Sequence, residues 1–101
     1  MIIVAIEVIA ETSSEVDRII AAAKPLVTAT RKDKGCLHYS YGRDVLDPTI
    51  LHVTEKWQDE PSMRAHMSQE HTTDFLTFLR TVKIKAIDAK VYDASGERDL
   101  F

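Results

Sequence analysis

Residues 2–10 (IIVAIEVIA) are almost entirely apolar and rich in β-branched side chains, and Glu7 is the only charged residue among them. A short apolar run of this composition predicts a β-strand that is buried on most of both faces. The rest of the fold therefore has to supply cover for both sides of this strand.

The next segment predicts an amphipathic helix of roughly five turns. Thr12 and Glu15 have the spacing of a capping box, and Ser14 is a second candidate for the N-cap. Apolar or small side chains then recur at helical spacing: Val16, Ile19, Ile20, Ala23, Val27 and Thr30. Pro25 removes one backbone hydrogen bond and should kink the helix. We expect the helix to end near Lys34–Gly35, because glycine readily adopts the left-handed conformation that ends many helices.

Residues 36–44 and 49–57 alternate in polarity and are joined by a turn at Asp47–Pro48, a pattern typical of an antiparallel hairpin. One face of this hairpin is expected to meet the helices. It carries Leu37, Tyr39, Tyr41, Arg43, Leu51, Val53, Glu55 and Trp57. The opposite face, which includes His38 and His52, is mixed in polarity rather than purely solvent-like.

Residues 60–67 and 71–80 predict two short helices, and residues 83–93 predict a last strand. The order is β-α-β-β-α-β, a ferredoxin-like α+β arrangement with a four-stranded antiparallel sheet and a helix pair in the second helical position. Helices cover one face of such a sheet, so we expect a second copy of the chain to cover the other and form a homodimer. Residues 1–101 are taken as a single domain. Its tail, about 94–101, ends in an apolar tip that suits contact with a partner subunit.

Composition argues against several classes of function. The chain has 13 Lys and Arg residues against 16 Asp and Glu residues, a net charge of −3, which argues against nucleic-acid binding. No apolar run has the roughly 20 residues of a membrane span, and the start lacks the basic stretch of a signal peptide. Cys36 is the only cysteine, so a cytoplasmic location is the simplest expectation. The sequence contains none of the common cofactor-binding or nucleophile motifs: P-loop, GxGxxG, GxSxG, HExxH or CxxC. We therefore expect no cofactor.

Aromatic and titratable residues gather between positions 36 and 75, and they predict a small-molecule pocket between the sheet and the helices. The expected lining residues are Tyr39, Tyr41, Val53, Glu55, Trp57 and Phe75. His66 and His71 lie in the helical region that follows the hairpin. Imidazole is the side chain best suited to proton transfer near neutral pH, so both histidines are candidates for a site.

Each candidate also has a purely structural interpretation. A histidine on an amphipathic helix is often a buried side chain with satisfied hydrogen bonds. Glu55 shares a face with Val53 and Trp57, so its carboxylate should be partly buried and needs a partner or a raised pKa. It is either a structural acceptor or the group that orients a histidine. His66 and His71 are five residues apart, unlike the i, i+4 pair of a helix-borne metal site, so we expect no metal.

Four segments follow one another in a distinctive order and spacing. They are Lys34–Tyr39 at the start of the second strand, Glu55–Glu60 at the end of the third, Ala65–Met67, and His71. With these segments the chain resembles the antibiotic biosynthesis monooxygenase (ABM) family of dimeric α+β barrels. The resemblance covers essentially the whole chain and implies that two sheets pair to close a barrel. Members include cofactor-independent oxygenases acting on quinols and polyketide anthrones, haem-degrading oxygenases, and an isomerase of a phosphorylated signalling sugar.

The resemblance separates these activities only in part. The haem-degrading members use an Asn on the first strand, where this chain has Ile6 or Glu7, and their haem-ligating His falls near Leu76. Haem degradation is therefore disfavoured. The oxygenases and the isomerase share the paired histidines, but the isomerase-like members tend to carry Tyr at the position of Trp57. This difference favours the oxygenases.

The resemblance thus implies a cofactor-independent monooxygenase that oxidises a small aromatic quinol or anthrone-like substrate with O2. His66 would act as the base, with His71 or Tyr39 assisting. The substrate-binding residues would be Trp57, Glu55, Tyr41, Val53 and Phe75. Two alternatives stay open: an isomerase or other proton-transfer enzyme acting on a small carbonyl compound, and a non-catalytic ligand-binding barrel.

Overall fold

The computed structural model describes residues 1–101. Its elements follow the order β1 (Ile2–Ala10), α1 (Ser13–Thr30), β2 (Cys36–Arg43), β3 (Ile50–Trp57), α2 (Glu60–Met67), α3 (Glu70–Leu79) and β4 (Ile84–Asp93). This order confirms the predicted ferredoxin-like α+β class, with the pair α2–α3 in the position of the second helix. None of the three helices has the length and apolar character that a bilayer crossing requires.

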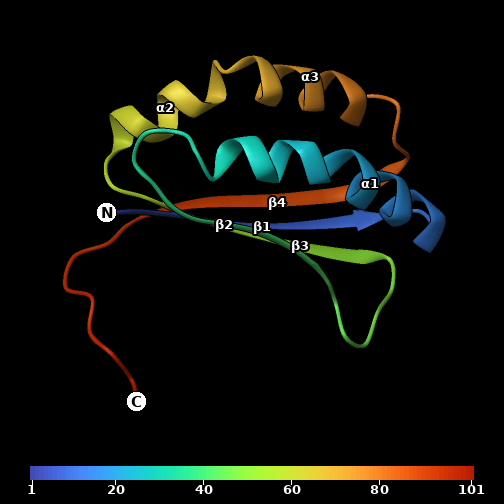
Figure 1. Ribbon diagram of the computed structural model, residues 1–101. Coiled ribbons are helices and arrows are strands. Elements are labelled where there is room, and N and C mark those ends of the chain that lie inside the picture. The colour runs from blue at the N-terminus through green and yellow to red at the C-terminus, as the bar shows by residue number, and fades with distance from the viewer.

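The four strands form one antiparallel sheet in the order β2-β3-β1-β4. All three helices lie on one face of this sheet, and the other face is left bare (Figure 1). Along β1, Val4 and Val8 are buried under the helices, whereas Ala5 and Glu7 on the bare face are exposed. The sequence predicts a strand buried on most of both faces, but within a single chain only the helix-facing side of β1 is buried.

The core lies between the sheet and the inner face of α1. Val16 and Ile19 from α1 and Leu51 and Trp57 from β3 are almost completely inaccessible to solvent. Burying an aliphatic or aromatic side chain of this kind contributes about 1.5–3 kcal/mol, so these contacts hold the two layers together. The packing of α1 against β3 also fixes the height of the helices above the sheet.

The start of α1 is capped as the sequence predicts, but only half of the capping box forms. The Thr12 hydroxyl accepts a hydrogen bond from the Glu15 backbone N–H at 3.2 Å. The Glu15 carboxylate turns away and accepts from the Lys83 backbone N–H at 2.7 Å. This bond ties the first turn of α1 to the segment that enters β4. The helix then runs through Pro25 as a single element to Thr30.

The prediction that α1 extends to Lys34–Gly35 is wrong. The helix ends at Thr30, and residues 31–35 form a turn in which the Asp33 backbone N–H bonds to the Thr30 carbonyl. Gly35 does adopt a left-handed conformation, with φ +80, but it does so at the entry to β2. This tight turn brings Asp33 back toward the helices.

The prediction that Leu37 faces the helices is also wrong. The pairing of β2 with β3 passes from Cys36 opposite Trp57 to His38 opposite Lys56, so Leu37 is a bulged residue without a partner. Its side chain is 58% exposed. A bulge inserts one residue and reverses the alternation that precedes it, so Cys36 rather than Leu37 shares the core-facing side with Trp57.

The C-terminal segment after β4, residues 94–101, has no regular secondary structure. It leaves the sheet at the end where β1 begins and extends away from the helices (Figure 1). Leu100 and Phe101 at its tip are fully exposed.

Candidate functional site

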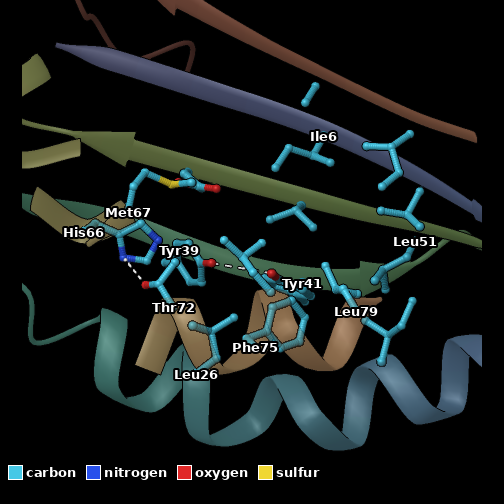
Figure 2. A pocket seen from close by; sticks show the side chains of 17 residues that line it. Ile6, Leu26, Tyr39, Tyr41, Leu51, His66, Met67, Thr72, Phe75 and Leu79 are labelled. Carbon is cyan, nitrogen blue, oxygen red and sulfur yellow. Dashed lines mark hydrogen bonds between the residues drawn. The ribbon is translucent and has the colours of Figure 1, made fainter. Parts of the chain in front are cut away.

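An apolar cavity with a volume of ≈ 180 Å³ lies between the sheet and the helical layer. Figure 2 shows its lining, with Ile6 and Leu51 contributed by strands, Leu26 by α1, and Phe75 and Leu79 by α3. The lining residues that can form hydrogen bonds through their side chains are Tyr39, Tyr41, Glu55, His66 and Thr72. The cavity is therefore an apolar space with a few polar groups, as small-molecule sites usually are.

Six of the eight predicted site residues line this cavity. They are Tyr39, Tyr41, Val53, Glu55, His66 and Phe75. Trp57 and His71 do not line it. Trp57 is fully buried behind His66, and His71 lies beyond His66 at the start of α3.

His66 is held on α2 between two aromatic rings. Its ring centroid lies 4.8 Å from that of Trp57 and 5.3 Å from that of Tyr39. Its Nδ1 atom is 3.1 Å from Asp33 Oδ2 and 3.3 Å from Thr72 Oγ1. Nε2 has no hydrogen-bond partner within the chain, and it points toward the side chains of the cavity (Figure 2). The site therefore holds one imidazole nitrogen and leaves the other available.

Asp33 joins the two histidines. Its Oδ2 atom lies 3.1 Å from Nδ1 of His66 and 2.9 Å from Nε2 of His71. An ionised carboxylate can only accept hydrogen bonds, so each of these nitrogens carries the proton. Neutral His66 then has its lone pair on Nε2, the tautomer that a base facing the cavity needs.

Asp33 is the member of this candidate site that sequence reasoning missed. It lies in the segment Arg31–Gly35, whose sequence indicates the solvent-exposed end of a helix rather than part of a site. The one available signal is an acidic side chain within an otherwise basic run directly before β2. The spacing of the two histidines alone does not indicate that their nitrogens and the Asp33 carboxylate gather within 4.8 Å of one another.

Glu55 and Trp57 form a buried pair on β3. The Trp57 indole Nε1–H donates to Glu55 Oε1 at 2.9 Å. Burial raises the pKa of Glu55, and the Trp57 hydrogen bond and the nearby His66 offset part of that rise. No hydrogen bond joins Glu55 to a histidine, so of the two sequence-based interpretations the structure fits the structural acceptor.

The two tyrosines on β2 are also paired. Their hydroxyl oxygens are 3.4 Å apart, and the Arg31 Nε–H donates to the Tyr39 carbonyl at 3.0 Å, which fixes this part of the strand. Burial raises the pKa of Tyr41 to about 12 and raises that of Tyr39 well above its usual range. Both phenols therefore stay protonated near neutral pH, and because one of their two protons lies in the bond between them, the pair can donate one hydrogen bond into the cavity.

The cavity opens to solvent along one side. Three of its lining side chains are also substantially exposed: Met67 at the end of α2, Leu76 on α3 and Ile87 on β4. These residues form the rim of the opening, between the helix pair and the outer strand. The cavity is therefore bounded by solvent-exposed side chains on this side.

The fold and the site define a ferredoxin-like α+β protein with an apolar cavity beside a carboxylate-linked histidine pair. The profile of the family described as "Antibiotic biosynthesis monooxygenase" matches residues 1–77. The chain belongs to this family. A search of curated protein sequences found no match.

Solved structures with this fold include a Deinococcus radiodurans protein provisionally assigned as an antibiotic biosynthesis monooxygenase, with a TM-score of 0.90 and 21% identity over 100% of this chain and 99% of that one. A conserved protein from Methanosarcina mazei Go1 has a TM-score of 0.84 and 24% identity over 93% of this chain and 92% of that one. A further antibiotic biosynthesis monooxygenase has a TM-score of 0.83 and 23% identity over 95% of this chain and 100% of that one. At these identities the similarity establishes the fold alone.

Proposed function

We propose that this protein is a cofactor-independent monooxygenase that oxidises a small aromatic quinol with O2 and works as a homodimer. The observation that carries the proposal is the hydrogen bond from His66 Nδ1 to Asp33, which leaves Nε2 of His66 directed at an apolar cavity. A base in this position can remove a phenolic proton from a substrate that then supplies its own electrons to oxygen.

The size of the cavity favours a single aromatic ring. An engineered apolar cavity of about 150 Å³ accommodates benzene. The ≈ 180 Å³ available here therefore encloses one substituted ring. A three-ring anthrone would extend out through the rim formed by Met67, Leu76 and Ile87, so we place quinols ahead of anthrones.

In the proposed reaction, His66 Nε2 takes the phenolic proton, and the Asp33 carboxylate stabilises the resulting imidazolium. His71 assists by holding the same carboxylate in place at 2.9 Å. The phenolate passes one electron to O2, the two radicals combine at a ring carbon that carries hydrogen, and the resulting peroxide anion takes the proton back from the His66 imidazolium. The hydroperoxide then loses water as its O–O bond breaks, so one oxygen atom stays on the ring as a quinone carbonyl and the other leaves as water.

The remaining polar groups would orient the substrate. The free phenol proton of the Tyr39–Tyr41 pair can donate to an oxygen of the quinol, and Glu55 can hydrogen-bond to a second hydroxyl. The aromatic walls suit a flat ring, and Phe75 lies edge-on to Tyr41 with centroids 6.0 Å apart. Positioning of this kind and exclusion of water would be the main contributions of the protein.

A proton-transfer enzyme acting on a phosphorylated carbonyl compound has less support. The lining of the cavity contains no lysine or arginine that could bind a phosphate. Arg31, Lys32 and Lys34, the basic cluster after the end of α1, are exposed, and Arg31 is bonded to the Tyr39 carbonyl.

A homodimer would cover the bare face of the sheet. This face carries half-buried isoleucines, Ile3, Ile9 and Ile50, together with the exposed Tyr92. These apolar residues lie at the two ends of the face, Ile3 with Tyr92 at one and Ile9 with Ile50 at the other, and polar residues such as Glu7 and His52 lie between them. Contact with the same surface of a second copy would cover both apolar ends.

The test is oxygen uptake by the purified protein against a panel of single-ring hydroquinones, with a boiled-protein blank because such compounds autoxidise. We expect uptake above the blank in wild type and at least a tenfold loss in His66→Ala. Arg64→Ala is the matched control, because Arg64 lies on the same helix α2, is exposed and pairs only with Glu60. Equal turnover in folded His66→Ala and wild type, or turnover that persists without oxygen, contradicts the proposal.

A further inference from the structure

We propose that Asp33, His66 and His71 bind a zinc-like divalent cation, and that the bound ion inhibits the enzyme by changing which nitrogen of His66 carries the proton. Two histidines and one carboxylate are a recurrent ligand set for such ions. The binding step stands on the geometry of this cluster alone, whereas the inhibition rests on the proposed function of His66.

The distances within the cluster fit a shared ion. Asp33 Oδ2 lies 3.1 Å from Nδ1 of His66 and 2.9 Å from Nε2 of His71. If each ligand atom lies about 2.1 Å from a common ion, these separations correspond to ligand–ion–ligand angles of roughly 90°. All three ligand atoms already lie within 4.8 Å of one another, so small side-chain shifts complete the site.

The cluster lies behind His66 as seen from the cavity. His66 lines the cavity, but Asp33 and His71 do not. Nδ1 of His66, which bonds to Asp33 and to Thr72, is a different ring atom from the nitrogen that points toward the cavity in Figure 2. An ion held by Nδ1 would therefore not touch a substrate in the cavity, and it would act only through the imidazole ring.

Solvent can reach the cluster without passing through the cavity. The Asp33 and His71 side chains are 12% and 23% exposed, whereas His66 is 2% exposed. An ion can therefore enter from the outer surface, binding first to Asp33 and His71 and then to His66. Substrate and ion would have separate routes to the two nitrogens of one histidine.

The ion would reverse the role of His66. Without it, Nδ1–H donates to Asp33 and Nε2 holds the lone pair. A cation can be bound only by a nitrogen lone pair, so the neutral ring must then carry its proton on Nε2. Nε2–H is a hydrogen-bond donor, and it can no longer accept the phenolic proton. The ion would thus inhibit without occupying the substrate cavity.

The first measurement is binding of Zn²⁺ by titration calorimetry, with the visible absorption of Co²⁺ as a second probe of nitrogen ligands and Mg²⁺ as a negative control. We expect one Zn²⁺ per chain and at least a tenfold loss of affinity in His71→Ala and in Asp33→Asn. His52→Ala is the matched control and should bind as wild type, because it removes an exposed histidine near Asp44 and Glu7 instead. Unchanged affinity in both cluster variants, or loss only in His52→Ala, overturns the proposal.

The second measurement is the tautomer of His66, read from the ring-nitrogen shifts in a two-dimensional ¹H–¹⁵N spectrum of the full chain. Zn²⁺ should move the proton from Nδ1 to Nε2 in wild type. A proton that stays on Nδ1 at saturating Zn²⁺ overturns the proposed switch. Oxygen uptake separates the two proposals: binding with a tautomer change but no loss of turnover would remove His66 as the base and leave the metal site standing.

Discussion

Nδ1 of His66 lies 3.1 Å from Oδ2 of Asp33, although the two residues are 33 positions apart in the chain. The bond connects α2 with the turn that follows α1, and the rings of Tyr39 and Trp57 hold the imidazole on either side of it. A histidine fixed in this way has one tautomer and one orientation, which is what a base needs before substrate arrives. The first prediction concerns this bond.

Asp33→Asn should lower turnover at least tenfold while preserving the fold. The amide keeps the shape of the side chain but loses the charge that stabilises the imidazolium, and a positioned general base contributes about 10²–10⁴ in rate. Initial rates of oxygen uptake measure the loss. The split between kcat and KM identifies its cause, because Asp33 bonds to His66 and does not line the cavity, so kcat should fall while KM stays near the wild-type value. Wild-type turnover in Asp33→Asn would remove this residue from the mechanism.

Glu55→Gln should change how stability depends on pH. The folded-state pKa of Glu55 is raised above its ordinary value of 4.5, so the native state holds its proton more tightly than the unfolded state. The stabilisation from this group is fully present below pH 4.5 and is lost as pH rises through the folded pKa. Wild type should therefore lose stability relative to Glu55→Gln as pH rises through this window.

For a single proton the difference between the two proteins changes by at most about 1.4 kcal/mol per pH unit. Urea unfolding at a series of pH values from 4 to 8 measures it. Glutamine can still accept the hydrogen bond from Trp57, so the comparison isolates the ionisation of Glu55. Parallel stability curves for the two proteins would contradict a raised pKa at this position.

Gly35→Ala should destabilise the protein. Gly35 has φ +80, and an added Cβ would lie 2.2 Å from Ser62 Oγ and 2.5 Å from Ser62 Cβ. The left-handed conformation costs a residue with a side chain about 1–2 kcal/mol, and the contact with α2 adds to this. Gly96→Ala is the matched control, because Gly96 has φ +77 with nothing within 4 Å and lies in the irregular tail. Chemical unfolding should show a loss only for Gly35→Ala, and equal stability of the two variants would contradict the expectation.

Ala5→Lys should weaken the proposed homodimer. Ala5 is exposed at the middle of β1 on the bare face of the sheet, where its neighbours on the adjacent strands are Thr54 and Lys90, so a long charged side chain there would oppose close packing of a second sheet. Light scattering after size-exclusion chromatography should place the dimer-to-monomer midpoint at a concentration at least tenfold higher than in wild type. Ala21→Lys makes the same substitution at an exposed position of α1 and should leave the midpoint unchanged. A wild-type protein that is monomeric at all concentrations would contradict the proposed assembly.

Most of the fold follows from local pattern. The β-branched run before Ala10, the Thr12 cap and the alternating hairpin each depend on neighbours in sequence, and each element forms where the pattern predicts it. The end of α1 and the direction of Leu37 could not be read this way. The first depends on a turn that packs Gly35 against Ser62, and the second depends on a bulge that has no signature in the alternation of side chains.

The candidate site could be predicted only for residues that lie on regular elements. Tyr39, Tyr41 and Val53 reach the cavity because strand periodicity places them on one face. Whether His66 and His71 meet in one cavity depends on the rotation of two short helices, and they meet instead at Asp33. That carboxylate comes from a turn, whose position is set by tertiary packing rather than by any repeat in the sequence.

The rim of the cavity has a consequence for which molecules the protein accepts. Met67 is an exposed, unbranched side chain at the opening, and its neighbours Leu76 and Ile87 lie on a helix and a strand rather than on a loop. A methionine adapts its shape easily and changes rotamer in picoseconds to nanoseconds, far faster than a backbone segment moves. The opening would then let in most small flat compounds, and selectivity among them would depend on the rigid residues that line the inside of the cavity.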